Sequence, residues 1–77
     1  MKIQIRTFGP LTDHLTDTEL EYSGEPTIAA LRRFLLEQYP AIKPVYFRMA
    51  LGSRMADDGE EIMDGDEVSL MPPFSGG

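Results

Sequence analysis

The residues of this chain best suited to chemistry are its last six, Pro-Pro-Phe-Ser-Gly-Gly at positions 72–77. Pro72 and Pro73 fix φ and favour an extended polyproline path away from the residues before them. Gly76 and Gly77 carry no side chains, so a narrow channel in another protein can close around their backbone. The segment predicts an arm that carries the terminal carboxylate into a partner's active site. An inert, frayed tail is the alternative, because chain ends are often Gly-rich.

The carboxylate of Gly77 needs activation before it can react. A terminal carboxyl group has an intrinsic pKa of about 3.5, so at neutral pH it is an anion and a poor electrophile. Joining it to AMP provides a leaving group, but no visible motif of this chain binds ATP. A separate enzyme must therefore activate it. A thiolate or persulfide that attacks the acyl-adenylate leaves sulfur on the terminal carbonyl, and the chain has no cysteine to intercept the activated end.

The rest of the chain offers little for an active site. His14 is the only histidine, and a lone loop histidine is more often exposed than catalytic. The serines lack a Gly-x-Ser-x-Gly elbow and a second candidate base. The acidic residues between positions 57 and 67 miss the alternating ligand order of an EF-hand loop and indicate solvated turns. We predict no metal site and no cofactor bound by the chain itself.

Length and composition predict one small acidic domain. Seventy-seven residues bury one thin core. Met1 leads directly into a strand-like segment, with no signal peptide and no membrane-length apolar run, and the absence of cysteine fits a reducing compartment. We therefore expect a cytoplasmic protein that does not bind membranes. The formal net charge of −6 argues against nucleic-acid binding and suits docking onto a basic face of another protein.

Apolar periodicity predicts one helix and four strands. The helix spans residues 28–39, with Thr27 as its N-cap and Pro40 as its stop. Residues 54–63 are irregular in pattern. The strands are expected where apolar and polar residues alternate, at residues 2–6, 18–22, 44–51 and 67–71.

This order of elements predicts an α+β protein with a β-grasp, or ubiquitin-like, fold. One main helix packs across a mixed four- to five-stranded sheet. The first two strands form a hairpin and the helix is a crossover, so the first and last strands can pair in parallel in mid-sheet. The β-grasp domain is expected at residues 1–71 and a flexible tail at 72–77. Met55 and Ile62 are expected to fill the core.

The last predicted strand directs its side chains to two sides. Val68 and Leu70 are expected to face the core, and Ser69 and Met71 to face outward. An outward Met71 and the nearby Phe74 would present an apolar patch suited to a protein interface. The basic side chains Arg6, Arg48 and Arg54 are candidates for pairing with acidic residues of a partner, and are equally compatible with plain solvation.

The C-terminal residues carry a resemblance to a known family. Residues 64–68, Asp-Gly-Asp-Glu-Val, followed by residues 70–77, closely resemble the C-terminus of MoaD, the small subunit of molybdopterin synthase, in the MoaD and ThiS family. The resemblance covers essentially the whole chain, since residues 8–11, 27–31 and 49–52 also match. Asp-Gly-Asp-Glu alone is a weak signal, but joined to a Pro-Pro-x-Ser-Gly-Gly terminus it is strong.

The resemblance implies a sulfur carrier, a non-catalytic donor subunit whose chemistry is performed by partner enzymes. Gly77 would be adenylated by a ubiquitin-activating-like adenylyltransferase, which uses ATP and Mg²⁺, and converted to a thiocarboxylate with sulfur from a sulfurtransferase. Ser75 and Gly76 would thread into the large subunit of molybdopterin synthase. There, in a heterotetramer, the sulfur helps to form the dithiolene of molybdopterin from a cyclic pyranopterin precursor. The residues expected at the partner interface are Met71, Pro73 and Phe74.

Three alternatives remain open from the sequence. A thiamine-pathway sulfur carrier shares the fold and the Gly-Gly end, although the Pro72–Pro73 pair favours molybdopterin. A ubiquitin-like modifier would join Gly77 to a lysine of a target protein. A plain binding module would have an inert tail, and deletion of Gly76 and Gly77 would then have no effect. The family often has a small aliphatic residue where this chain has Phe74, which bears on how the tail fits its channel.

Overall fold

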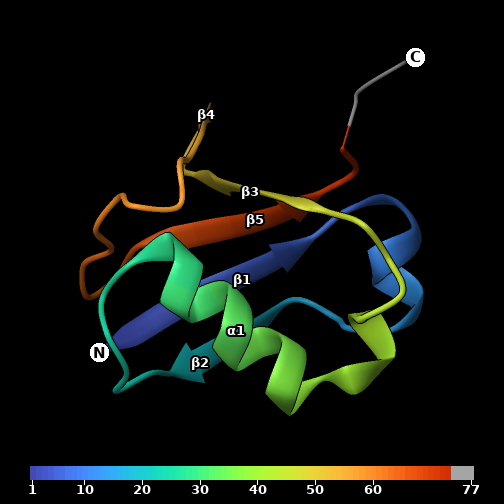
Figure 1. Ribbon diagram of the computed structural model, residues 1–77, viewed down its shortest axis with the longest axis horizontal. Coiled ribbons are helices and arrows are strands. Elements are labelled where there is room, and N and C mark those ends of the chain that lie inside the picture. The colour runs from blue at the N-terminus through green and yellow to red at the C-terminus, as the bar shows by residue number, and fades with distance from the viewer. Residues whose placement is uncertain (74–77) are drawn as a thin grey trace.

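Five strands and one α-helix make up residues 1–73, the part of the chain that the computed structural model describes (Figure 1). The predicted tail residues 74–77 lie outside these described residues. Two short 3₁₀ helices, η1 (Gly9–Asp13) and η2 (Pro40–Ile42), connect the longer elements. The main elements are β1 (Lys2–Thr7), β2 (Thr18–Glu21), α1 (Ile28–Gln38), β3 (Arg48–Leu51), β4 (Arg54–Met55) and β5 (Glu67–Met71).

The strands form one mixed sheet in the order β2-β1-β5-β3-β4. β1 and β2 are an antiparallel hairpin, as predicted. β1 and β5 pair in parallel at the centre of the sheet, with Ile5 beside Val68, which confirms the predicted pairing of the first and last strands. β5 is also antiparallel to β3, so it is bonded on both sides. The end of β5 therefore has a fixed place between two other strands.

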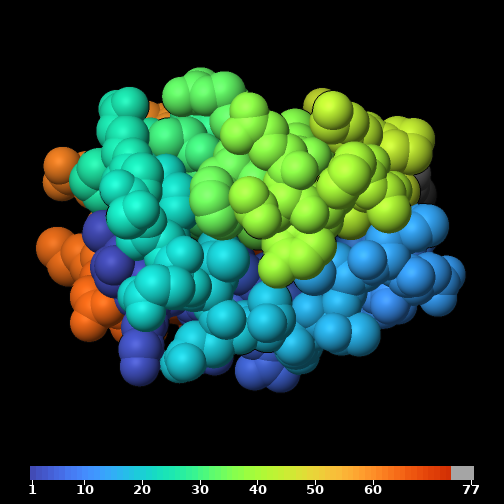
Figure 2. All heavy atoms as spheres, turned by 90° about the horizontal axis from the view of Figure 1, so that it is seen from below, coloured from blue at the N-terminus to red at the C-terminus, as the bar shows by residue number. Residues whose placement is uncertain are grey.

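The helix α1 covers one face of this sheet. Its N-cap is Thr27, whose side-chain oxygen accepts a hydrogen bond of 3.3 Å from the amide of Ala30, and it ends two residues before Pro40. One stripe of apolar side chains on the helix is fully buried: Ile28, Leu31 and Leu35 each have 0% exposure. Figure 2 views this side of the molecule, where the atoms of α1 and of the connecting segments leave little of the sheet visible. No helix in residues 1–73 is long and apolar enough to cross a membrane.

The core lies between α1 and the sheet. Val68 and Leu70 are buried in it, as predicted, and so is Ile62. Met55 was expected there, but this prediction is wrong, because its side chain is 42% exposed. β4 is a short edge strand in which Met55 lies opposite Ala50, and this register turns the side chain to the sheet face away from α1. Ser69 points to the same face, as predicted, but is buried.

The third predicted strand was too long at its start. Residues 44–47 lie outside β3, which begins at Arg48 opposite Met71. β3 starts late because of its partner strand, β5. The next pairs of the β3–β5 ladder would need Pro72 and Pro73, which have no N–H to donate. The amide of Val45 is used instead in a turn, donating to the carbonyl of Ile42 at 3.0 Å.

We expect Thr27→Ala to destabilise the domain by about 1 kcal/mol, because it leaves an N-terminal amide of α1 without its acceptor. The melting temperature should fall by roughly 4–8 °C in a domain of this size, as measured by circular dichroism. Thr16→Ala, at an exposed threonine, is the matched control and should change little. Equal effects of the two substitutions would show that the cap does not contribute to stability.

Candidate functional site

The sheet face away from α1 carries a hollow that runs along β5, with a volume of about 300 Å³. Gly52, Ser53 and Glu67 line one end of it, and the other five lining residues define what we call the open face: Phe8, Ala50, Met55, Ser69 and Met71. They come from β3, β4, β5 and the residue after β1, and the register of the sheet places them together. Ala50 lies between Ser69 on one side and Met55 on the other.

The open face has a floor of small side chains and a rim of large ones. Ala50 and Ser69 are only 4% and 6% exposed, whereas Phe8 and Met55 are each 42% exposed. Large apolar side chains at a monomer's surface lose contact with water only when a partner covers them. A shallow hollow between two such side chains is suited to receive an apolar side chain of another protein.

Charged side chains flank the open face unequally. Arg6 lies 3.8 Å from both Asp17 and Glu67, so its charge is shared between two exposed carboxylates. Arg48 pairs with Met71 in the β3–β5 register and forms no ion pair within residues 1–73. Of the three arginines considered from the sequence, Arg48 is thus the most available to a partner's carboxylate.

An ion pair holds the loop that carries Met55. Arg54 donates a hydrogen bond of 2.7 Å to Glu60, across the turn that follows β4. This hydrogen bond, and the Arg54 charge behind it, hold the pKa of the Glu60 carboxyl below its ordinary value. The pair therefore closes the turn of residues 55–59, while the pairing of β4 with β3 holds β4 at the edge of the sheet.

We expect Arg54→Gln to raise the pKa of Glu60 toward its ordinary value. A lowered pKa means that the pair contributes stability above the pKa of the unfolded chain, and that this contribution is lost as pH falls through the folded-state pKa. A carbon-13 NMR titration of the Glu60 carboxyl measures the change. Lys43→Gln, at an exposed lysine of the η2 end, should leave the titration unaltered. An unchanged titration in Arg54→Gln would contradict the assignment of the shift to this pair.

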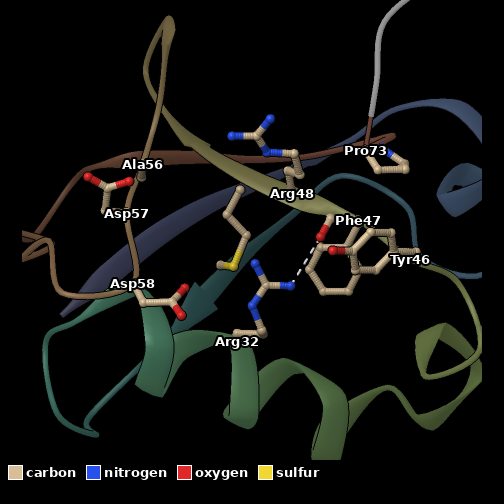
Figure 3. A pocket seen from close by; sticks show the side chains of 9 residues that line it. Arg32, Tyr46, Phe47, Arg48, Ala56, Asp57, Asp58 and Pro73 are labelled. Atoms are coloured by element: carbon tan, nitrogen blue, oxygen red, sulfur yellow. Dashed lines mark hydrogen bonds between the residues drawn. The ribbon is translucent and has the colours of Figure 1, made fainter. Parts of the chain in front are cut away.

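A second groove lies between α1, β3 and the loop after β4 (Figure 3). Its volume is about 640 Å³, and Pro73 lines it together with Tyr46 and Arg48. Arg32 of α1 reaches into it, donates a hydrogen bond of 3.1 Å to the carbonyl of Phe47, and lies 4.9 Å from the centre of the Phe47 ring. Asp57 and Asp58 also line the groove, so it carries charges of both signs, and it adjoins Pro73, the last described residue of the chain.

The structure brings together only part of the predicted site. Met71 is half-buried on the open face, and Pro73 is half-buried at the second groove. The other predicted site residues, Phe74, Ser75, Gly76 and Gly77, lie outside the described residues. His14 is exposed in the loop after η1. Among residues 1–73, no group of three or more potential ligands is placed to hold a metal ion.

Two residues of the open face, Phe8 and Met55, were not predicted from the sequence to lie there. Phe8 had a detectable signal. In β1 the outward positions Lys2, Gln4 and Arg6 are all polar, and continuing the alternation puts Phe8 on that polar face. Met55 had no such signal, because a core methionine and an interface methionine look alike in a sequence.

Comparison with known proteins places the chain among small β-grasp proteins. Residues 5–77 match the model of the ThiS family. The chain is 32% identical over 62 residues to a molybdopterin synthase sulfur carrier subunit from Caenorhabditis briggsae, covering 75% of this chain and 74% of that protein.

Solved structures confirm the predicted β-grasp fold. Subunits 1 and 2 of the molybdopterin-converting factor from Helicobacter pylori form a complex, one chain of which matches with a TM-score of 0.76 and 26% identity, covering 100% of both chains. SAMP1 from Haloferax volcanii matches with a TM-score of 0.81 and 22% identity, also covering 100% of both chains. A putative molybdopterin converting factor subunit 1 from Pyrococcus furiosus gives a TM-score of 0.83 at 19% identity, covering 95% of this chain and 98% of that one.

Proposed function

Because the chain belongs to the ThiS family of sulfur carriers and is homologous to a molybdopterin synthase sulfur carrier subunit, we propose that it carries sulfur on the carboxyl group of Gly77 for the synthesis of molybdopterin. One observation carries the proposal. The family match extends to residue 77, and the residues there are the Ser-Gly-Gly end that the chemistry requires.

The proposed reaction proceeds in three steps at Gly77. A carboxylate oxygen bonds to the α-phosphorus of ATP, and pyrophosphate leaves. The outer sulfur of a protein persulfide then bonds to the carbonyl carbon, and AMP leaves with the electron pair of the broken bond. A thiol reduces the resulting acyl disulfide and releases the thiocarboxylate. The proposed partners for these steps are an adenylyltransferase, which would hold ATP and Mg²⁺, and a sulfurtransferase.

The chain's own contribution to this chemistry is presentation. β5 is bonded on both sides and ends at Met71, so it fixes the point from which the tail leaves the domain. The absence of cysteine protects the activated carbonyl from internal attack. In the proposal, Ser75 and Gly76 pass through the partner's channel because they are small, and the domain itself supplies no acid, base or metal.

The proposed receiving partner is the large subunit of molybdopterin synthase, in a heterotetramer. The related complex of subunits 1 and 2 from Helicobacter pylori supports this partnership. The open face lies beside the end of β5, so a partner that covers Phe8, Met55 and Met71 would also stand next to the tail. Pro73 and Phe74 would extend this contact, as predicted from the sequence.

A ubiquitin-like modifier is the second candidate function. The likeness to SAMP1 supports the shared fold, and in this case Gly77 would form an amide with a lysine of another protein. A sulfur carrier in the thiamine pathway is the third candidate function. The family name alone does not distinguish it from a carrier for molybdopterin synthesis. The cytoplasmic location expected from the sequence stays a prediction.

Intact-mass spectrometry tests the proposal. The chain is incubated with a cognate adenylyltransferase, MgATP and a persulfide donor. We expect a mass gain equal to the exchange of one oxygen for one sulfur, and none when ATP is omitted. Addition of the large subunit and the pyranopterin precursor should then return the original mass. An unchanged mass with a competent enzyme would refute the carrier role, and a mass gain that the large subunit does not reverse would favour the thiamine pathway or protein modification.

A further inference from the structure

The root of the tail, Pro72 and Pro73, lies between the ends of two strands. On one side the β3–β5 ladder finishes with Arg48 beside Met71. On the other side the amide of Phe8 donates to the carbonyl of Leu70 at 3.1 Å, which is the last bond between the β1 segment and β5. Pro72 is the first residue after the β3–β5 ladder and after the hydrogen bond between Phe8 and Leu70. Its position therefore depends on packing contacts.

Gly9 provides that packing contact. It follows Phe8 directly and has φ +63°, a left-handed conformation that glycine adopts without steric cost. Its carbonyl accepts a hydrogen bond of 2.9 Å from the Thr12 hydroxyl, which ties it into η1. A Cβ atom at Gly9 would lie 2.9 Å from Cγ and 3.6 Å from Cδ of Pro72. The first distance is shorter than real Cβ contacts, so any side chain there would displace the proline ring.

The geometry points to Gly9 as a positioning residue for the tail, an inference that rests on the proposed function. The missing side chain lets the Pro72 ring sit against the backbone at the end of β1. Cγ of Pro72 belongs to a closed ring, so a change of ring pucker moves it much less than a rotation moves the end of a flexible side chain. Relief of the contact therefore requires a shift of the backbone where Gly9 and the tail root meet. Gly9 therefore sets the direction in which the chain continues toward Gly77.

A matched control separates this role from backbone strain. Gly65, in the turn before β5, also has positive φ (+90°), and a Cβ added there would meet nothing within 4 Å. Gly9→Ala and Gly65→Ala both force an alanine into the left-handed region. Each variant should lose roughly 5–10 °C in melting temperature. Only Gly9→Ala should move Pro72.

Steady-state kinetics of thiocarboxylate formation give the main readout. We expect the maximal rate of Gly9→Ala to fall about tenfold, because small misplacements of a reacting group reduce rates strongly. The KM for the chain should stay within about twofold, since the substitution adds one methyl group and removes no side chain from the surface of the domain. Gly65→Ala should keep the wild-type rate at a temperature where both variants are folded. Equal maximal rates in the two variants would overturn the inference.

Removal of the clashing ring supplies a rescue. Pro72→Ala is expected to slow thiocarboxylate formation in the wild-type background, because the tail root loses its stiff residue. In the Gly9→Ala background the same change should raise the rate several-fold, because it removes Cγ from the contact. The effect of Pro72→Ala on the rate would thus have opposite signs in the two backgrounds, which shows that the two residues are energetically coupled. Additive effects would show that Gly9 and Pro72 act independently and would refute the inference.

NMR of the free chain keeps this test separate from the test of the carrier function. A nuclear Overhauser effect between the Gly9 α-protons and the Pro72 ring protons is expected in the wild type, and shifted Met71 and Pro73 resonances in Gly9→Ala only. Absence of these signals would overturn the positioning role whatever the chemistry. If they are present but no sulfur is taken up, the proposed function fails and the packing of Pro72 on Gly9 stands.

Discussion

Deletion of Gly77 is expected to abolish sulfur uptake and to leave the melting temperature unchanged. The carboxylate of the shortened chain would belong to Gly76 and would stop about 3.5 Å short of its position in the full-length chain. Such a displacement is large against the sub-ångström precision that group transfer needs. Addition of one residue after Gly77 should have the same effect. Intact-mass spectrometry after incubation with the adenylyltransferase, MgATP and a persulfide donor measures the uptake.

Two further measurements make this prediction specific. Gly59→Ala, in an exposed turn where an added Cβ meets nothing within 4 Å, should retain full uptake. Differential scanning calorimetry should give the same unfolding transition for the deletion and the wild type, since within residues 1–73 every residue of the core cluster precedes Pro72. A lowered melting temperature in the deletion would contradict the expectation that residue 77 contributes nothing to the folded domain. Normal sulfur uptake by the deletion would remove Gly77 from the chemistry.

Met55→Asp is expected to weaken binding of the large subunit about 100-fold, or about 2.7 kcal/mol. The substitution replaces a half-exposed apolar side chain on the rim of the open face with a charge that would lose its water on docking. Isothermal titration calorimetry with the cognate large subunit measures the affinity. Because the side chain is not in the core, the free energy of unfolding of the free chain should change by only about 0.5 kcal/mol.

Met63→Asp is the matched control for this prediction. Met63 is 68% exposed and lies in the turn before β5, away from the hollow between Phe8 and Met55. The two variants have the same composition and the same net charge, so general repulsion from an acidic partner is equal in both. Binding within about twofold of wild type is expected for Met63→Asp. Similar losses of affinity in both variants would show that the added charge alone weakens binding. The open face would then not be the docking surface.

The fold could be predicted because local signals and global topology agree. Ile3 and Ile5 alternate with polar residues, Thr27 and Pro40 bracket a single apolar stripe, and the order of elements leaves few economical ways to bury it. The wrong predictions concern features of the strands that are determined by tertiary strand pairing. β3 is shorter than its alternation suggests because its neighbour ends at Pro72, and Met55 is exposed because the register with Ala50 determines its face.

The candidate site could be predicted only where it is continuous in sequence. The end of the chain is one run of residues whose chemistry is local, so its pattern was visible. The open face joins residues from β3, β4, β5 and the residue after β1, and the contact of Gly9 with Pro72 joins the start of η1 to the residue after β5. Both depend on β1 and β5 being neighbours, and no pattern in either segment specifies the close approach of a proline ring to one particular glycine.

The parallel pairing of β1 with β5 also constrains when the domain can fold during its synthesis. The centre of the sheet needs the first strand and the last one, so the β1–β5 ladder joins residues made at opposite ends of translation. Such non-local contacts form slowly, because loop closure must precede them. A nascent chain that stops before Glu67 lacks β5, the central strand, and stays unfolded and open to proteases. Quality control can thus remove incomplete chains before any of them competes with the finished domain for its partners.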